Sequence, residues 1–179
     1  MSTLENLYKD QIKKKFIDSK SFSNLMEIPK LEKIIISRGI GESIKNSKSI
    51  DSTIQFLIDV SGQKPVLCKA KKSISNFSLR EGQIIGAKVT LRGKKMYDFF
   101  TKLINIVIPK IRDFRGLPLN SFDGDGNYNF GIKDDSIFPD CTKDFDKNRG
   151  LNITLVTNTN SDEHALDLLN HFSFPFRKR

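Results

Sequence analysis

The chain has 179 residues, a hydrophobic fraction of 37% and a formal net charge of +9. This length suits one domain with one core, and the positive charge favours an anionic polymer or an anionic membrane as the partner. No apolar run approaches the roughly 18 residues that span a bilayer, so we expect no membrane partner. From the first residues we expect neither a secretory signal nor a transit peptide. The two cysteines, Cys68 and Cys141, form no CxxC pair, so the sequence predicts no metal site and no disulfide framework.

The first third of the chain alternates between helical and extended patterns. Residues 3–18 carry apolar side chains at helical spacing and predict an N-terminal helix within residues 1–20. Isoleucine-rich residues 31–38 predict a strand that ends at a Gly-Ile-Gly turn. Helical spacing returns from Ile50 and closes at Ser61-Gly62.

Two further strands, 64–69 and 84–92, flank a basic loop at 70–83 that is too polar to be buried. In the second of these strands, Val89 and Leu91 alternate with three polar residues, Lys88, Thr90 and Arg92. Successive side chains of a strand point to opposite faces of the sheet. One face is therefore expected to pack on the core, and the other to present hydrogen-bond donors to an acidic partner.

The second half begins with a helix over 94–108, which Pro109 ends, and continues into a loop-rich region at 109–148. Strands are predicted at 128–133 and 151–157, and Ser161 is placed as the N-cap of a last helix. Helices and strands in this order predict an α+β fold. We expect a single domain over 1–179, with a mainly antiparallel sheet, helices packed on one face and a protruding basic loop.

The positive charge is concentrated in one segment. Residues 64–95 contain nine basic residues and one acid, Glu81, so this stretch has a net charge of +8 against +9 for the whole chain. Such localisation is typical of a phosphate-binding surface, and a solvated basic face with no partner is the alternative. The acidic residues of 133–147 form a mixed-sign surface that suits a protein partner better than RNA.

Two motifs imitate other functions. The stretch DGDGN at 123–127 resembles the start of a calcium loop, but it lacks the required glycine and glutamate and is better explained as a tight turn. His164 and His171 have no third ligand or carboxylate pair near them in the sequence pattern. No acid–base constellation is visible, so the sequence predicts neither an enzyme nor a cofactor.

Several motifs recur in a fixed order and cover nearly the whole chain. They are GQKP (62–65), KAKKS (69–73), GAKVTLRG (86–93), PKIRDFRG (109–116), SFDG (121–124), GNY (126–128) and RG (149–150). With these motifs the chain resembles the bacterial-type family of large-subunit ribosomal protein five, which binds 5S rRNA. The strings IRDFRG and KVTLRG are the most specific.

The resemblance implies three contact surfaces. An rRNA-binding surface would comprise Ser37, Gly39, Gly41, Gln63, Lys64, Lys88, Thr90, Arg92 and Lys94. The basic loop would approach P-site tRNA through Lys71, Lys72, Ser73 and Arg80, with Phe77 anchoring the loop. An intersubunit bridge to small-subunit protein thirteen would use Arg112, Asp113, Phe114, Arg115, Asp134 and Asp135.

The resemblance also implies a place in the central protuberance, beside large-subunit rRNA and other proteins of that region. Two departures from the family pattern bear on the contacts. Ser37 stands where the family usually has Asn, and Asn76 replaces a usual glycine, although Asn tolerates positive φ. The abundance of Lys, Asn, Ile, Ser and Phe is typical of AT-rich organelle genomes, so we expect a mitochondrial ribosome, with plastid and bacterial origins open.

Two other functions remain open from the residues alone. A general single-stranded nucleic-acid-binding module would need exposed aromatics for base stacking, and Phe77 is the one candidate in the basic segment. A nuclease would need converging acids or a metal, and that segment holds only Glu81.

Overall fold

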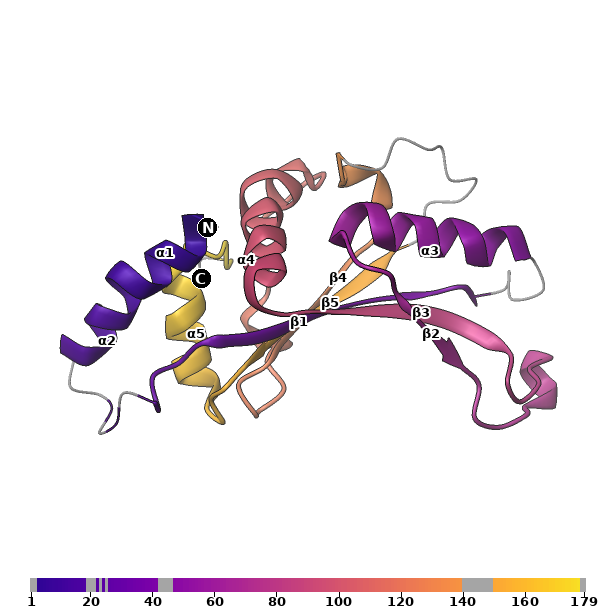
Figure 1. Ribbon diagram of the computed structural model, residues 1–179, viewed down its shortest axis with the longest axis horizontal. Coiled ribbons are helices and arrows are strands. Elements are labelled where there is room, and N and C mark those ends of the chain that lie inside the picture. The colour runs from indigo at the N-terminus through magenta and orange to yellow at the C-terminus, as the bar shows by residue number, and fades with distance from the viewer. Residues whose placement is uncertain are drawn as a thin grey trace. The chain divides into compact units, whose positions relative to one another are not determined.

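The computed structural model describes residues 3–18, 22, 24, 26–41, 47–139 and 150–177. Five antiparallel strands form one sheet in the order β2-β3-β1-β5-β4 (Figure 1). The strands are β1 (Leu31–Gly39), β2 (Val66–Lys69), β3 (Ile84–Leu91), β4 (Tyr128–Ile132) and β5 (Leu151–Thr157). The predicted α+β fold with an antiparallel sheet is confirmed, and β5 has the bounds that its alternating pattern predicted.

The chain divides into two compact units. Unit 1 comprises Met1–Ile34, Leu91–Phe130 and Thr154–Arg179, and unit 2 comprises Ile35–Thr90 and Gly131–Ile153. We describe each unit by itself, and the assignment of the whole chain to a single domain stays a prediction.

Unit 2 is built on helix α3 (Ser47–Ser61), which lies along one face of its strands (Figure 1). Phe56, Leu57 and Val60 of α3 are fully or almost fully buried against that face. The helix begins three residues before the apolar pattern that starts at Ile50, because a helix does not require an apolar side chain in its first turn. Gly62 follows at φ +63 and donates its N–H to the carbonyl of Ile58, which ends the helix as predicted.

The N-terminal helix of unit 1 has three parts, α1 (Thr3–Leu7), a π-helical turn η1 (Tyr8–Ile12) and α2 (Lys13–Asp18). Leu7 and Lys13 keep right-handed helical angles at both junctions, so the backbone runs on as one helix, as predicted. Ile12 and Phe16 are buried, and the Tyr8 hydroxyl donates to the carbonyl of Pro29 at 3.0 Å.

The middle helix of unit 1 also changes its winding. It consists of α4 (Gly93–Lys102), a π-helical turn η4 (Leu103–Val107) and a 3₁₀ turn η5 (Ile108–Lys110). Pro109 lies in the first turn of η5, and the chain becomes extended at Ile111. Proline therefore ends the helix close to the predicted place.

The last helix, α5 (Asp162–His171), begins after Ser161 as predicted, but the Ser161 side chain makes no capping hydrogen bond. Ser161 therefore occupies the predicted N-cap position without using its hydroxyl. Short 3₁₀ turns lie at η3 (Ser75–Phe77), η6 (Leu119–Ser121) and η7 (Asp135–Ile137).

Rings from β4 and the C-terminal segment pack together in unit 1, with Tyr128 5.7 Å from Phe174 and 5.5 Å from Phe176 between centroids. Phenylalanine thus fills the core of a chain that has no Trp.

Candidate nucleic-acid interface

Strand β3 presents a polar side to the open face of the sheet in unit 2. Val89 and Leu91 are almost completely buried, whereas Lys88 is exposed and Thr90 is half-buried. Val66 of β2 is the cross-strand partner of Lys88 and is 63% exposed. Directly opposed residues of an antiparallel pair share a face, so the face that carries Lys88 is the one that α3 leaves uncovered. The alternation predicted from the sequence is confirmed.

Strand β1 contributes Ser37 and Gly39 to the same open face. Ile36 and Arg38 are buried on the opposite face, whereas Ser37 is half-buried and Gly39 is exposed. A Cβ atom on Gly86 of β3 would lie 2.8 Å from the carbonyl oxygen of Arg38, so the two strands approach closely because this residue is glycine. Gly41 is exposed at φ +61, at the end of this described stretch.

Gln63 links the start of β2 to β3. Its side-chain amide donates to the carbonyl of Thr90 at 3.2 Å, and its backbone N–H donates to the Ser61 hydroxyl at 3.2 Å. The next residue, Lys64, is exposed. The Ser61 hydroxyl in turn donates to the backbone carbonyl of Gln63 at 3.1 Å, so Gln63 is held in place by the protein, and Lys64 is the exposed side chain beside it.

Arg92 and Lys94, predicted for the same rRNA surface, belong to unit 1. Both are exposed. Arg92 has extended backbone angles immediately before α4 and makes no side-chain cap to that helix. Its guanidinium therefore does not cap α4.

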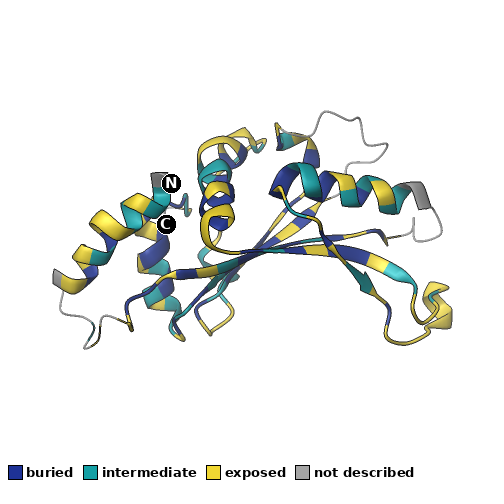
Figure 2. Cartoon of the chain, in the orientation of Figure 1, coloured by how far each residue is buried: buried dark blue, intermediate teal, exposed yellow. Residues whose placement is uncertain are grey.

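The basic loop at 70–83 is closed by two pairs of backbone hydrogen bonds. At its base, Ala70 donates to Gln83 at 2.8 Å and accepts from Gly82 at 3.0 Å. Nearer its tip, Ile74 and Leu79 exchange hydrogen bonds of 2.9 and 3.1 Å. Figure 2 shows exposed residues along this loop. The predicted protruding loop is confirmed as an ordered hairpin rather than an irregular segment.

The side chains of the loop differ in what holds them. Lys71, Lys72 and Arg80 are exposed, whereas the Ser73 hydroxyl accepts a hydrogen bond from the Glu81 N–H at 2.9 Å. Phe77 is 77% exposed in η3, so its ring does not fasten the loop to the rest of the described chain, and its predicted tRNA contact stays a prediction. The left-handed residue of the turn is Ser78, at φ +50, and not Asn76.

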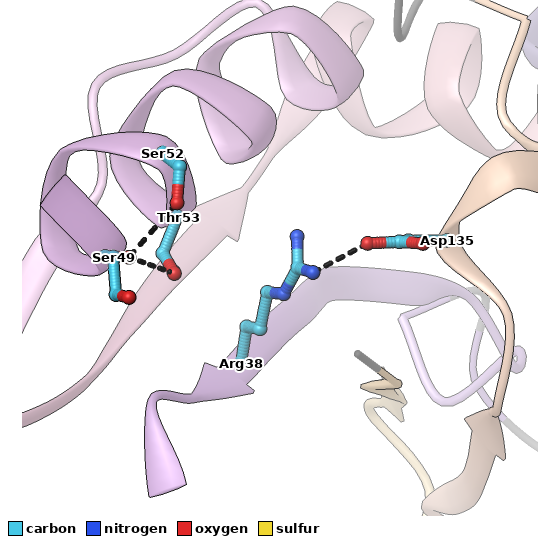
Figure 3. Close-up of polar contacts among 5 residues, drawn as sticks. All are labelled: Arg38, Ser49, Ser52, Thr53 and Asp135. Carbon is cyan, nitrogen blue, oxygen red and sulfur yellow. Dashed lines mark hydrogen bonds and ion pairs between the residues drawn. The ribbon is translucent and has the colours of Figure 1, made fainter. Parts of the chain in front are cut away.

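The residues predicted for the intersubunit bridge fall in both units. In unit 1, Arg112, Asp113 and Arg115 are exposed and Phe114 is half-buried. In unit 2, Asp134 is exposed, but Asp135 is 3% exposed and pairs with Arg38 (Figure 3). Asp135 was predicted as a bridge residue, and its burial against Arg38 leaves it no surface for a direct contact. The sequence gave no sign of this partner on β1.

The rest of the predicted acidic stretch, residues 140–147, lies outside the described residues, as does Cys141. Cys68 is half-buried on β2 with a free thiol.

The motifs that imitate other functions have structural explanations. Asp123 accepts hydrogen bonds from the N–H groups of Asp125 and Asn127, each at 3.0 Å, which makes DGDGN a tight turn as predicted. His171 packs edge-on against Phe16 at 5.2 Å between ring centroids. Among the described residues, no group of three His, Cys, Asp or Glu side chains could hold a metal ion. Within the same ranges, no helix is long and apolar enough to cross a membrane.

Comparison with known proteins identifies the family. Residues 84–176 match the family model for the C-terminus of ribosomal protein L5, and residues 24–80 match the model named ribosomal protein L5. The chain belongs to the ribosomal protein L5 family. Its relatives include large ribosomal subunit protein uL5 of Moorella thermoacetica, which is 50% identical over 99% of both chains. The uL5 proteins of Macrococcus caseolyticus and Acholeplasma laidlawii are each 48% identical, over 99% of this chain and 100% and 99% of theirs.

As a member of the L5 family, the protein is a structural constituent of the large ribosomal subunit and not an enzyme. It associates with rRNA and with other ribosomal proteins, and its location is the ribosome. The relatives named above are bacterial, so they give no support to the mitochondrial location expected from composition. Only the ribosomal location is retained.

Arg38 is the residue whose importance the sequence pattern did not reveal. It stands in phase with Ile34 and Ile36, so its position on β1 predicts burial. An arginine at a buried position signals an internal partner, because a buried charge must be paired. Sequence alone could not name Asp135, which lies 97 positions further along the chain.

Proposed function

We propose that the open face of the sheet in unit 2 binds 5S rRNA. The observation that carries this proposal is the alternation on β3, where Lys88 and Thr90 lie opposite the buried Val89 and Leu91. Ser37 and Gly39 extend the polar side onto β1, and Lys64 extends it beyond β2. Arg92 and Lys94 add exposed charge directly after β3 in the chain.

The chemistry of these side chains suits folded RNA. Hydroxyl and amide groups can bond to 2′-hydroxyls and base edges, and lysine and arginine can meet phosphates. Ser37 reaches less far than the usual Asn, so its contribution would be smaller. Gly39 lets the RNA backbone approach the strand closely, because it has no side chain.

Binding of 5S rRNA can be measured against salt concentration, with a random RNA of equal length as the competitor. Arg92→Ala should weaken binding of 5S rRNA by about 1–3 kcal/mol if its guanidinium makes a charge-assisted contact. Lys30→Ala is the matched control, because Lys30 is an exposed lysine outside the proposed surfaces. Equal affinity for 5S rRNA and random RNA would contradict the proposal, and an unchanged affinity of the arginine variant would remove Arg92 from the surface.

We further propose that the loop at 70–83 contacts P-site tRNA through Lys71, Lys72 and Arg80. The exposed ring of Phe77 is available at the end of the hairpin. Ser73 joins this contact, because its hydroxyl accepts from the Glu81 N–H and can still donate to the tRNA. Replacing Lys71 and Lys72 together by alanine should reduce P-site tRNA occupancy and leave 5S rRNA binding unchanged. Equal losses of both would show that the loop belongs to the 5S rRNA surface.

For the intersubunit bridge we propose contacts with small-subunit protein thirteen from Arg112, Asp113, Phe114, Arg115 and Asp134. Asp135 is left out as a direct contact because it is buried. In unit 1, Arg112, Asp113 and Arg115 present charges of both signs, as is common in protein-binding surfaces, and Asp134 is proposed as a separate contact from unit 2.

A general single-stranded nucleic-acid-binding module is the second candidate, because Phe77 is an exposed aromatic in a basic loop. That function predicts similar affinity for unrelated single strands and a large loss of affinity in Phe77→Ala. The 5S rRNA proposal predicts that this variant binds 5S rRNA as the unmodified protein does.

A further inference from the structure

A buried ion pair joins two distant segments of unit 2. The Arg38 guanidinium of β1 donates to the Asp135 carboxylate at the start of η7 (Figure 3). The side chains are only 2% and 4% exposed. Both charges are therefore removed from water, which is uncommon for arginine and aspartate.

Two aromatic rings extend this pair into a cluster. The Arg38 guanidinium carbon lies 4.2 Å from the ring centroid of Phe56 on α3, in a cation–π arrangement. Phe56 meets Phe138 edge-to-face, with the ring centroids 6.0 Å apart and the planes at 86°. Phe138 follows η7 and donates its N–H to the carbonyl of Asp135 at 3.2 Å. The cluster thus joins β1, α3 and the η7 turn.

The contribution of such a pair is to geometry more than to net stability. Moving two charges out of water carries a free-energy cost that roughly cancels their attraction, and apolar replacements of similar volume are often as stable. What an apolar pair lacks is direction. A guanidinium donating to a carboxylate holds two backbones in one register, whereas apolar side chains can slide.

The neighbours of the pair are the residues proposed to contact partners. Ser37 and Gly39 flank Arg38 and lie on the open face, since alternate residues of a strand point to opposite sides. Asp134 precedes Asp135 and is exposed. The close approach of β1 to Gly86 leaves the β1 backbone little room to shift toward β3.

We infer that Arg38 and Asp135 are positioning residues, which hold the outward residues of β1 and the turn that carries Asp134 in one fixed arrangement. The pair touches no partner itself. It acts through Ser37 and Gly39 on one side and through Asp134 on the other. The consequence for RNA binding rests on the proposed function of the open face.

The test compares the unmodified protein with Arg38→Met/Asp135→Leu, which replaces the pair by apolar side chains. Arg38→Met and Asp135→Leu are made singly as well, although each leaves one buried charge without its partner and should fold less stably than the double variant. Val60→Ala is the matched control, because Val60 is buried on α3 but is not part of the ion pair. Thermal unfolding identifies the variants that are folded.

Amide hydrogen exchange of the free protein reads the positioning directly. The reporters are the Phe138 N–H, bonded to Asp135, and the Ile40 N–H, bonded to Ile85 at 3.0 Å. In the double variant both should exchange at least tenfold faster than in the unmodified protein, while the Leu57 amide within α3 is unchanged. In Val60→Ala, the exchange of these two amides should not be accelerated more than that of the other amides of unit 2. Unchanged protection of both reporters in a folded double variant would overturn the inference.

Binding of 5S rRNA provides the second measurement. The double variant should bind at least threefold more weakly than Val60→Ala. Unchanged affinity alongside faster exchange would overturn the link to the RNA surface and leave the positioning role supported. If the unmodified protein fails to bind 5S rRNA, the proposed function fails, whereas hydrogen exchange still decides the role of the pair.

Discussion

The loop at 70–83 and the turn at 123–127 are both polar and contain glycine, but their side chains are used differently. In the turn, Asp123 accepts two backbone hydrogen bonds and a third from the Asn127 side chain at 2.8 Å. In the loop, backbone pairs form the hairpin, and Lys71 and Lys72 remain exposed. The turn uses its polar groups to hold its own shape, and the loop keeps its charges for solvent or a partner.

This difference distinguishes polar side chains that maintain the fold from polar side chains that are available for binding. A polar residue whose hydrogen bonds stay within the chain should affect stability when it is replaced. An exposed charge without a structural role should affect binding and leave stability nearly unchanged. Substitutions in both kinds of region test this separation, in order of decreasing effect.

The largest effect is expected for Gly126→Ala in the turn. Gly126 has φ +75, and an added Cβ would lie 2.4 Å from the carbonyl oxygen of Thr159. The strained backbone and the clash together should lower the free energy of unfolding by about 3 kcal/mol, measured by urea denaturation. Gly124→Ala is the control, because it has φ +92 but nothing within 4 Å of the added atom. Equal losses in the two variants would show that the Thr159 contact is unimportant.

Lys88→Ala should weaken binding of 5S rRNA by about 1–2 kcal/mol and reduce the salt slope by roughly 0.7–0.9, if Lys88 neutralises one phosphate. Its unfolding midpoint should not move, because the side chain is exposed. Val66→Ala changes the cross-strand neighbour of Lys88 on the same face and should leave the salt slope intact. A slope that is unchanged in Lys88→Ala would place the phosphates elsewhere.

Asp123→Asn should lower stability at neutral pH by about 1 kcal/mol, a modest value because the turn is exposed. Burial acts to raise the pKa of Asp123, but hydrogen bonds from Asn127 and Asp125 outweigh it and hold the pKa below its ordinary value of 3.8. A carboxylate with a lowered pKa contributes stability above its unfolded pKa and loses that contribution as pH falls through the folded value. Unfolding curves between pH 6 and about pH 2 should therefore fall less steeply for the variant. Parallel curves would contradict this role of the carboxylate.

The smallest change in stability is expected for Phe77→Ala. Its ring is 77% exposed, so truncation should change the free energy of unfolding by less than about 0.5 kcal/mol. Measuring P-site tRNA occupancy with the same variant then tests whether the ring contacts the tRNA. A stability loss above about 1 kcal/mol would mean that the ring packs on the protein in solution.

Local patterns predicted much of this fold. The alternation on β3 and β5 placed both strands and their outward residues, because one buried face imposes a period of two. Gly62 and Pro109 marked helix ends through their own backbone preferences. These features depend on residues that are close in sequence, so the sequence displays them.

Features that depend on distant residues were missed. The pairing of Arg38 with Asp135 joins residues 97 positions apart, and no local pattern links them. The π-helical turns η1 and η4 also left no sign, since their side chains keep a helix-like spacing. Asp162, the first residue of α5, accepts hydrogen bonds from the N–H groups of Gly124 and Gly126, at 3.2 and 2.9 Å, and so stabilises a turn 36 or more positions earlier in the chain.

Strand β2 ends the sheet on one side and has only four residues. An outer strand offers free backbone groups to which a neighbouring molecule can add, and long apolar examples lead to aggregation. Here the strand is short, exposed Lys69 is its last residue and exposed Lys64 lies two residues before it, and both charges repel a second copy. This edge of the sheet is therefore a poor site for pairing with a second copy of the chain.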